Sequence, residues 1–160
     1  MITISSIEPM PLDKFDVYKK YTEAKNVDCY WVYTEDENDL WTSGATKQDR
    51  INDPQMLLSY RDGELCEGSV ANNGDVIPIL HLNVINDPVA DIFLSNIGNT
   101  VEFADITWTV CARNTLIANE SIGTSIYNTV EKYIKYEGSV LEKFLNSWLD
   151  QHRNNKIIFT

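Results

Sequence analysis

The sequence predicts a single α+β domain over residues 1–160. A chain of 160 residues has room for one compact domain and leaves none for two substantial ones. Its composition, with 43% hydrophobic and 23% charged residues, is typical of a globular protein with a buried core. Alternating apolar residues typical of strands and longer apolar periods typical of helices occur in separate segments. An α+β fold accommodates both kinds of segment.

Aromatic residues near the start of the chain predict a helix over residues 12–21. Phe15, Tyr18 and Tyr21 recur at every third position, which places them on one helical face. Pro11 is suited to the beginning of this helix, because proline is tolerated in the first turn. We expect the three rings to pack in the core.

Residues 30–41 predict two strands joined by an acidic turn. Segments 30–33 and 40–41 are rich in aromatic and β-branched residues, which suit a half-buried pleated surface. The carboxylates of residues 35–39 lie between them, so we expect a solvated turn there.

The tetrapeptide Ile-Asn-Asp-Pro occurs at residues 51–54 and again at 85–88. An aspartate accepts hydrogen bonds from the free amides of a helix start, and the proline after it fits the first turn. Each copy therefore predicts the beginning of a short helix. Two matches of four residues indicate local turns rather than a duplicated fold.

The segment after residue 97 predicts a hairpin. Apolar residues alternate over 101–110, Arg113 and Asn114 supply a turn, and residues 115–118 return.

The C-terminal part of the chain predicts two helices and a strand. Residues 130–134 form a short amphipathic stretch, and residues 140–149 form a longer one for which Ser139 is the expected N-cap. The apolar tail at 156–160 predicts a closing strand.

The chain is strongly acidic, with 13 Lys+Arg against 24 Asp+Glu and a formal charge of −11. Seven basic and fifteen acidic side chains give residues 1–80 a charge of −8, and six and nine give residues 81–160 a charge of −3. This excess opposes sequence-independent binding to phosphate backbones. The apolar runs are far shorter than the roughly twenty residues of a bilayer span. We expect neither a nucleic acid nor a membrane as a partner.

The cysteines and the start of the chain predict a cytoplasmic location. Cys29, Cys66 and Cys111 are an odd number without close spacing, which favours reduced thiols over a disulfide framework. The first six residues lack the basic start and long apolar stretch of a secretory signal.

No catalytic or cofactor signature is visible in the sequence. The acidic run at 35–39 lacks the central glycine and the register of a calcium loop. No Cys-x-x-Cys pair occurs, and His81 and His152 are isolated from other zinc-ligand types. The glycines do not have a nucleotide-binding spacing. We expect no metal, no cofactor and no enzymatic activity, although paired carboxylates leave a glycosidase-like or metal-assisted site as a third hypothesis.

Segments of the second half resemble an uncharacterised family of bacterial domains. Residues 98–103, 108–110, 116–120 and 126–128 are similar to that family's opening, which begins with a "G-x-x-V-x-F…W-x-V" hairpin. Residues 138–146 are similar to its later segment "S-x-L-R-x-W-L-N".

The remaining motifs of that family lie earlier in this chain. Residues 41–44 resemble "W-L-R-S-P-G", residues 62–65 its "D-G-x-V" turn, and residues 76–82 "V-R-P-A-L-x-L". Residues 1–90 thus resemble the family's later half and residues 97–150 its earlier half. A circular permutation explains this order, and so does the pairing of two incomplete copies; permutation is the simpler explanation.

The resemblance implies a fold of the C-type-lectin-like superfamily, which includes the formylglycine-generating enzymes. Such domains are α+β, with helices flanking small twisted antiparallel sheets and a long loop region that often carries ligands. Thr42 and Ile77 stand in place of the family's two arginines, and Ala45 stands in place of its proline. An anion site built on those arginines is not expected here. The calcium motifs of sugar-binding lectins and the reactive cysteines of the oxygenases are absent.

These observations favour a non-catalytic recognition module that binds a protein or small-molecule ligand through its loop region. Aromatic and arginine side chains often anchor interfaces, although core packing is the stronger interpretation for Trp31 and Trp41. The candidate binding residues are Tyr33, Glu35, Asp36, Asp39, Trp41, Ser43, Tyr60 and Arg61. The alternative is a small acidic intracellular inhibitor or sequestering protein, of the phage or mobile-element type, whose acidic half occupies a basic groove on a host enzyme. The sequence leaves the oligomeric state open.

Overall fold

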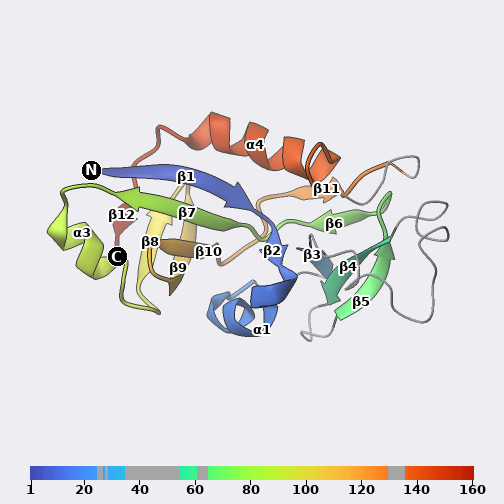
Figure 1. The fold of residues 1–160 in the computed structure, drawn as a ribbon, viewed down its shortest axis with the longest axis horizontal. Coiled ribbons are helices and arrows are strands. Elements are labelled where there is room, and N and C mark those ends of the chain that lie inside the picture. Colours follow the sequence, from blue (N-terminus) through green and yellow to red (C-terminus); the bar gives the residue numbers. More distant parts are fainter. Residues whose placement is uncertain (25–26, 28, 35–54, 61–64, 130–135) are drawn as a thin grey trace.

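The computed structural model describes residues 1–24, 27, 29–34, 55–60, 65–129 and 136–160, with the backbone alone for 55–60 and 66–68. The described elements are two β-sheets with short helices at their sides and one long helix, α4, lying along the first sheet (Figure 1). The predicted α+β class agrees with this mixture of helices and antiparallel strands.

The first sheet is antiparallel throughout and curls. Its strands, in spatial order, are β1 (Ile2–Glu8), β7 (Ile79–Val84), β10 (Thr115–Ala118), β9 (Ile106–Ala112), β8 (Thr100–Phe103) and β12 (Ile158–Phe159). The predicted hairpin is confirmed as β8, β9 and β10, and the predicted closing strand is confirmed as β12. The sequence analysis did not predict β1, which forms one edge of this sheet.

The second sheet combines antiparallel and parallel pairs. Its strands are β11 (Thr124–Ile126), β6 (Asn73–Asp75), β3 (Cys29–Tyr33), β4 (Gln55–Tyr60) and β5 (Leu65–Ser69), with β2 (Met10–Pro11) beside β3. The strand predicted over 30–33 is confirmed as β3, which pairs parallel with β2 and β6 and antiparallel with β4. Trp31 and Val32 in this central strand are fully buried.

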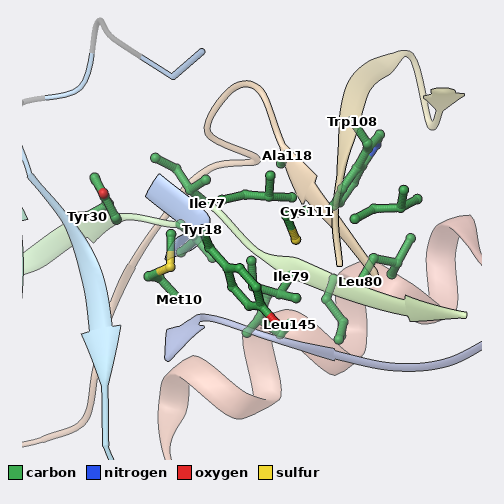
Figure 2. Packing of buried hydrophobic residues seen from close by; sticks show 14 of the residues in the cluster. Met10, Tyr18, Tyr30, Ile77, Ile79, Leu80, Trp108, Cys111, Ala118 and Leu145 are labelled. Atoms are coloured by element: carbon green, nitrogen blue, oxygen red, sulfur yellow. The ribbon is translucent and has the colours of Figure 1, made fainter. Parts of the chain in front are cut away.

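A buried apolar segment carries the chain from the second sheet into the first. Val76 and Ile77 are fully buried, and the segment continues directly into Ile79 and Leu80 of β7. The backbone of Val76 is bonded on both sides: its N–H donates to the carbonyl of Gly123 at 3.0 Å, and its carbonyl accepts from Ile122 N at 2.9 Å. Figure 2 shows Ile77, Ile79 and Leu80 in the core beside Tyr18 and Leu145.

The helix predicted over 12–21 is present in a shortened form. The α-helix α1 covers Phe15–Tyr18, and 3₁₀ turns at Leu12–Lys14 and Lys19–Tyr21 flank it. Phe15 and Tyr18 are buried and Tyr21 is half-buried, so the predicted core packing of this face is confirmed.

Two helix starts follow the capping rules used in the prediction. Asp87 precedes α3 (Pro88–Phe93), and its Oδ1 accepts from Ala90 N at 3.1 Å. Ser139 precedes α4 (Val140–His152), and its Oγ accepts from Glu142 N at 3.0 Å. Both caps are confirmed. The acidic turn at 35–39, the second strand at 40–41, the first Ile-Asn-Asp-Pro and the helix at 130–134 lie outside the described residues.

Each sheet contributes one fully buried tryptophan to the core: Trp31 from β3 and Trp108 from β9. The indole N–H of Trp31 donates to Ser125 O at 2.7 Å, and that of Trp108 donates to Phe103 O at 3.0 Å. Trp148 of α4 packs against Trp108, with ring centroids 6.1 Å apart. Buried indoles are stable only when their N–H finds a partner, and both do.

Gly74 of β6 gives Trp31 its space. A Cβ built on Gly74 would lie 2.9 Å from the indole Nε1 of Trp31. We expect Gly74→Ala to lower the free energy of unfolding by about 1–3 kcal/mol, because the ring would have to move and its bond to Ser125 would lengthen. Urea denaturation monitored by tryptophan fluorescence measures the change. Asn73→Ala in the same strand, at an exposed position, is the control and should stay within about 0.5 kcal/mol of the wild type. Equal stability of the two variants would contradict the packing constraint.

Candidate functional site

The described structure places two of the eight predicted binding residues. Tyr33 is the last residue of β3, and Tyr60 is the last residue of β4. Tyr60 pairs with Cys29 in the β3–β4 ladder, so Tyr33 and Tyr60 lie at opposite ends of it, roughly 13 Å apart along the strand. The structure therefore does not bring these two residues together. The other six lie outside the described residues: Glu35, Asp36, Asp39, Trp41, Ser43 and Arg61.

Tyr33 belongs to a polar cluster that joins the two sheets. Its hydroxyl donates to Glu8 Oε2 at 2.8 Å, and Glu8 Oε1 lies 3.2 Å from His81 Nε2. Glu8 ends β1, His81 lies in β7 and Tyr33 ends β3, so three strands each supply one side chain. We call these three residues the Tyr–Glu–His cluster. The Glu8 and His81 side chains are 25% and 33% exposed, so the cluster is open to solvent on one side.

A β-bulge in β1 sets the direction of the Glu8 side chain. The β1–β7 register shifts between Ile4 and Ser6, which inserts one extra residue into β1. Without the bulge, Ile4 and Ile7 would lie on opposite faces of the strand, yet both are buried in the core. The extra residue keeps both isoleucines inside and directs Glu8 away from the apolar face that Ile7 occupies.

The path of the chain after Glu8 brings this carboxylate beside Tyr33. β1 belongs to the first sheet, and β2 follows it after one residue but belongs to the second. Pro11 of β2 pairs in parallel with Tyr33 of β3. The chain therefore leaves the first sheet just after Glu8, at the place where Tyr33 ends β3 of the second sheet.

A second tyrosine extends the cluster. The Tyr33 and Tyr136 rings contact each other in a tilted arrangement, with centroids 4.8 Å apart and an interplanar angle of 34°. Burial raises the pKa of Tyr136, and the nearby carboxylates of Glu142 and Glu8 raise it further. Burial also raises the pKa of Tyr18, with smaller contributions from Cys111, Glu8 and Asp13. Both phenols therefore stay neutral. Glu8 is the carboxylate that raises the pKa of both tyrosines.

This arrangement suits binding of a group that carries positive charge or hydrogen-bond donors. It offers the partly exposed Glu8 carboxylate at the Tyr33 hydroxyl, next to the pair of contacting tyrosine rings, and carboxylates and aromatic rings both attract cations. The Cys111 thiol is not part of this cluster: it is buried in the core, and burial raises its pKa to about 12. Among the described residues, no three His, Cys, Asp or Glu side chains converge as a metal site would require.

The described helices have neither the length nor the apolar composition needed to cross a bilayer. A comparison of the whole chain with known family models, curated proteins and solved structures finds no match.

The sequence analysis missed Glu8, His81 and Tyr136 as neighbours of Tyr33. His81 is isolated along the sequence, and its carboxylate partner is 73 residues away. The alternation of apolar and polar residues at the start of the chain could have predicted the strand β1. It could not have predicted that β1 pairs with β7, because alternation within one strand carries no information about its partner.

Removing the Tyr33 hydroxyl tests the cluster's contribution to stability. We expect Tyr33→Phe to lower the free energy of unfolding by about 0.5–1.5 kcal/mol, because Glu8 loses one hydrogen-bond donor and stays half-buried. Chemical denaturation at pH 7 measures it. Tyr21→Phe is the matched control, since within the described residues the half-buried Tyr21 hydroxyl makes no hydrogen bond, and this variant should be neutral. Loss of equal size in both variants would show that the bond to Glu8 contributes nothing.

The buried Cys111 thiol predicts a pH dependence of stability. In the unfolded chain its pKa returns to the ordinary value of 9.0, whereas the folded value is about 12. Between these values the unfolded chain releases the proton and the folded chain keeps it, so stability falls as the pH rises above about 9. We expect Cys111→Ala to be less stable than the wild type at pH 7, and this deficit to shrink by pH 10.5. Urea denaturation under reducing conditions at both pH values measures it; a deficit that does not change with pH would contradict the prediction.

Proposed function

We propose that this chain is a non-catalytic recognition module that binds its ligand through the end of the second sheet at which Tyr33 lies. The observation that carries the proposal is the Tyr–Glu–His cluster. It fixes Tyr33 by a hydrogen bond and a ring contact, and Tyr33 is two residues before the acidic segment 35–39. A binding loop is most effective when a rigid element holds its base, because less conformational entropy is then lost on binding.

The ligand best suited to this end of the molecule is a cationic group on a protein or a small molecule. Residues 1–80 carry a charge of −8, and the Glu8 carboxylate lies beside two tyrosine rings. Opposite charges on ligand and site speed encounter and select against acidic competitors. The second candidate function, an acidic intracellular inhibitor of a host enzyme, draws on the same charge and requires a basic groove on that enzyme. Neither function requires a membrane, a nucleic acid or a cofactor.

We further propose that the fold is a circularly permuted C-type-lectin-like domain. Two observations support this. β7, which holds most of the motif at 76–82, pairs antiparallel with β10 of the hairpin that resembles the family's opening. The N- and C-termini lie at the same end of the molecule, as joining and reopening a chain requires (Figure 1). The pairing of Trp41 with the Trp108 hairpin, which permutation also requires, lies outside the described residues.

Native mass spectrometry of the protein purified gently from its own host tests the recognition function. We expect an added mass, either a small molecule or a protein partner, that dissociates as salt increases. Tyr33→Ala should lower the occupied fraction at least tenfold, and Tyr21→Ala should leave it unchanged. A bare chain at low salt, together with an empty pull-down, would reject the recognition function.

Neutralising the acidic segment separates the two candidates. The triple variant Glu35→Gln, Asp36→Asn, Asp39→Asn keeps the size of the side chains and removes three charges. The inhibitor function predicts that partner binding becomes at least tenfold weaker and loses most of its salt dependence. The recognition function, with Tyr33 as its anchor, predicts that the triple variant weakens binding less than Tyr33→Ala does, because Tyr33 and the Glu8 carboxylate remain. The affinity at 50 and 300 mM salt, measured by titration calorimetry with the captured partner, decides between them.

A further inference from the structure

A groove separates the two edges of the first sheet. The sheet curls so that its edge strands, β1 and β12, line the same groove of about 890 Å³. Ile2, Thr3 and Ile4 form one wall, Ile158 and Phe159 form the other, and residues 153–157 after α4 lie between them. The elements that line this groove lie at the end of the molecule that holds the chain termini (Figure 1). The groove uses the first residues of β1 and the Tyr–Glu–His cluster uses its last residue, Glu8, so the two sites share a strand but no residue.

The register of β1 shows which of its backbone groups face the groove. Leu82 is the partner of Ile4 in the β1–β7 ladder, but its N–H donates to Asn114 O at 2.9 Å, on the other side of β7. Because hydrogen bonding alternates along an antiparallel pair, Ile4 directs its N–H and carbonyl away from β7. The Arg153 guanidinium confirms this direction, since its Nη1 donates to Ile4 O at 3.0 Å.

On both walls of the groove, further residues direct their backbone N–H and carbonyl groups away from the neighbouring strand. Met1 and Ile85 bond one another through both backbone groups, at 2.7 and 2.8 Å, so the next residue, Ile2, faces outward like Ile4. On the opposite wall, Thr160 N donates to Thr100 O at 3.1 Å, so the preceding Phe159 directs its backbone away from β8. Within the described chain, the outward N–H groups of Ile2 and Ile4 make no hydrogen bond to protein.

The charge of the groove is opposite to that of the whole protein. Arg153 and Lys156 are exposed along it, and its one acidic lining residue, Asp87, lies 3.5 Å from the terminal ammonium of Met1. Arg153 has five N–H donors and uses one on Ile4, which leaves a fork suited to a carboxylate. Ile2, Ile157 and Phe159 supply half-buried apolar surface between these cations.

We propose that this groove binds an extended acidic peptide segment of a partner protein, which adds to the first sheet as a strand along the outer edge of β1. Its main chain pairs with the outward N–H and carbonyl of Ile2 and with the outward N–H of Ile4, and its carboxylates contact Lys156 and the remaining donors of Arg153. Main-chain pairing supplies affinity in such strand additions and side-chain contacts supply selectivity. An acidic segment fits because Arg153 and Lys156 make this groove positively charged. The rest of the protein, with its net charge of −11, repels such a segment.

Two synthetic heptapeptides of alternating threonine and valine test the proposal, one flanked by glutamates and its twin by lysines. We expect the glutamate peptide to bind at least tenfold more tightly in fluorescence polarisation at 50 mM salt. In amide NMR spectra it should shift the signals of Ile2, Ile4 and Phe159. Equal affinity of the twins, or shifts confined to other strands, would overturn the proposal.

Two kinds of variant separate the main-chain contribution from the charge contribution. Ile2→Pro removes an outward N–H without touching the β1–β7 ladder and should weaken the glutamate peptide about tenfold, whereas Ile2→Val should not. Lys156→Gln leaves the Arg153 bond to Ile4 intact and should reduce the preference for glutamate over lysine. Unchanged affinity in both variants, with unchanged melting temperatures, would overturn the proposal. A concentration-dependent dimer in sedimentation velocity that Ile2→Pro abolishes would also overturn it, because a second copy of the chain would then occupy β1.

Discussion

The structure depends on a stretch of backbone that passes from one sheet to the other with no contact with water. Val76 and Ile77 are fully buried, and a buried peptide group is tolerable only when its N–H and carbonyl are hydrogen-bonded. Residues 122 and 123 supply those bonds to Val76, just before β11 joins the second sheet. The crossing segment therefore fixes β6, β7 and β11 together, and with them the relative position of the two sheets.

The local features of the sequence predicted much of this fold. Capping at Asp87 and Ser139, the β8–β9–β10 hairpin, the strand β3 and the burial of Phe15 and Tyr18 all follow from residue type and periodicity within short segments of the sequence. Such preferences are local, so a single sequence expresses them. The order of strands within each sheet and the parallel pairing of β3 with β2 and β6 are long-range, and nothing in the periodicity determines them.

The candidate site was predictable only in part for the same reason. Tyr33 was identified because of its residue type and its position before an acidic segment. Glu8 and His81 come from strands whose pairing spans more than seventy residues, and a one-residue bulge decides where the Glu8 side chain points. A bulge changes the face of every later residue in a strand, and the sequence of residues 2–8 contains no glycine or proline that would mark one.

The turn between β8 and β9 shapes the way this chain reaches its folded state. Ala104 and Asp105 both have positive φ, 55° and 60°, at positions where most tight hairpins use asparagine and glycine. A turn of this kind is costly for residues with a Cβ, so the hairpin gains little from its own loop and is held by packing of Trp108 against Phe103 and against Trp148 of α4. The second of these contacts joins residues forty positions apart. Together with the pairing of β1 with β7, it raises the contact order of the fold, so we expect the chain to fold slowly.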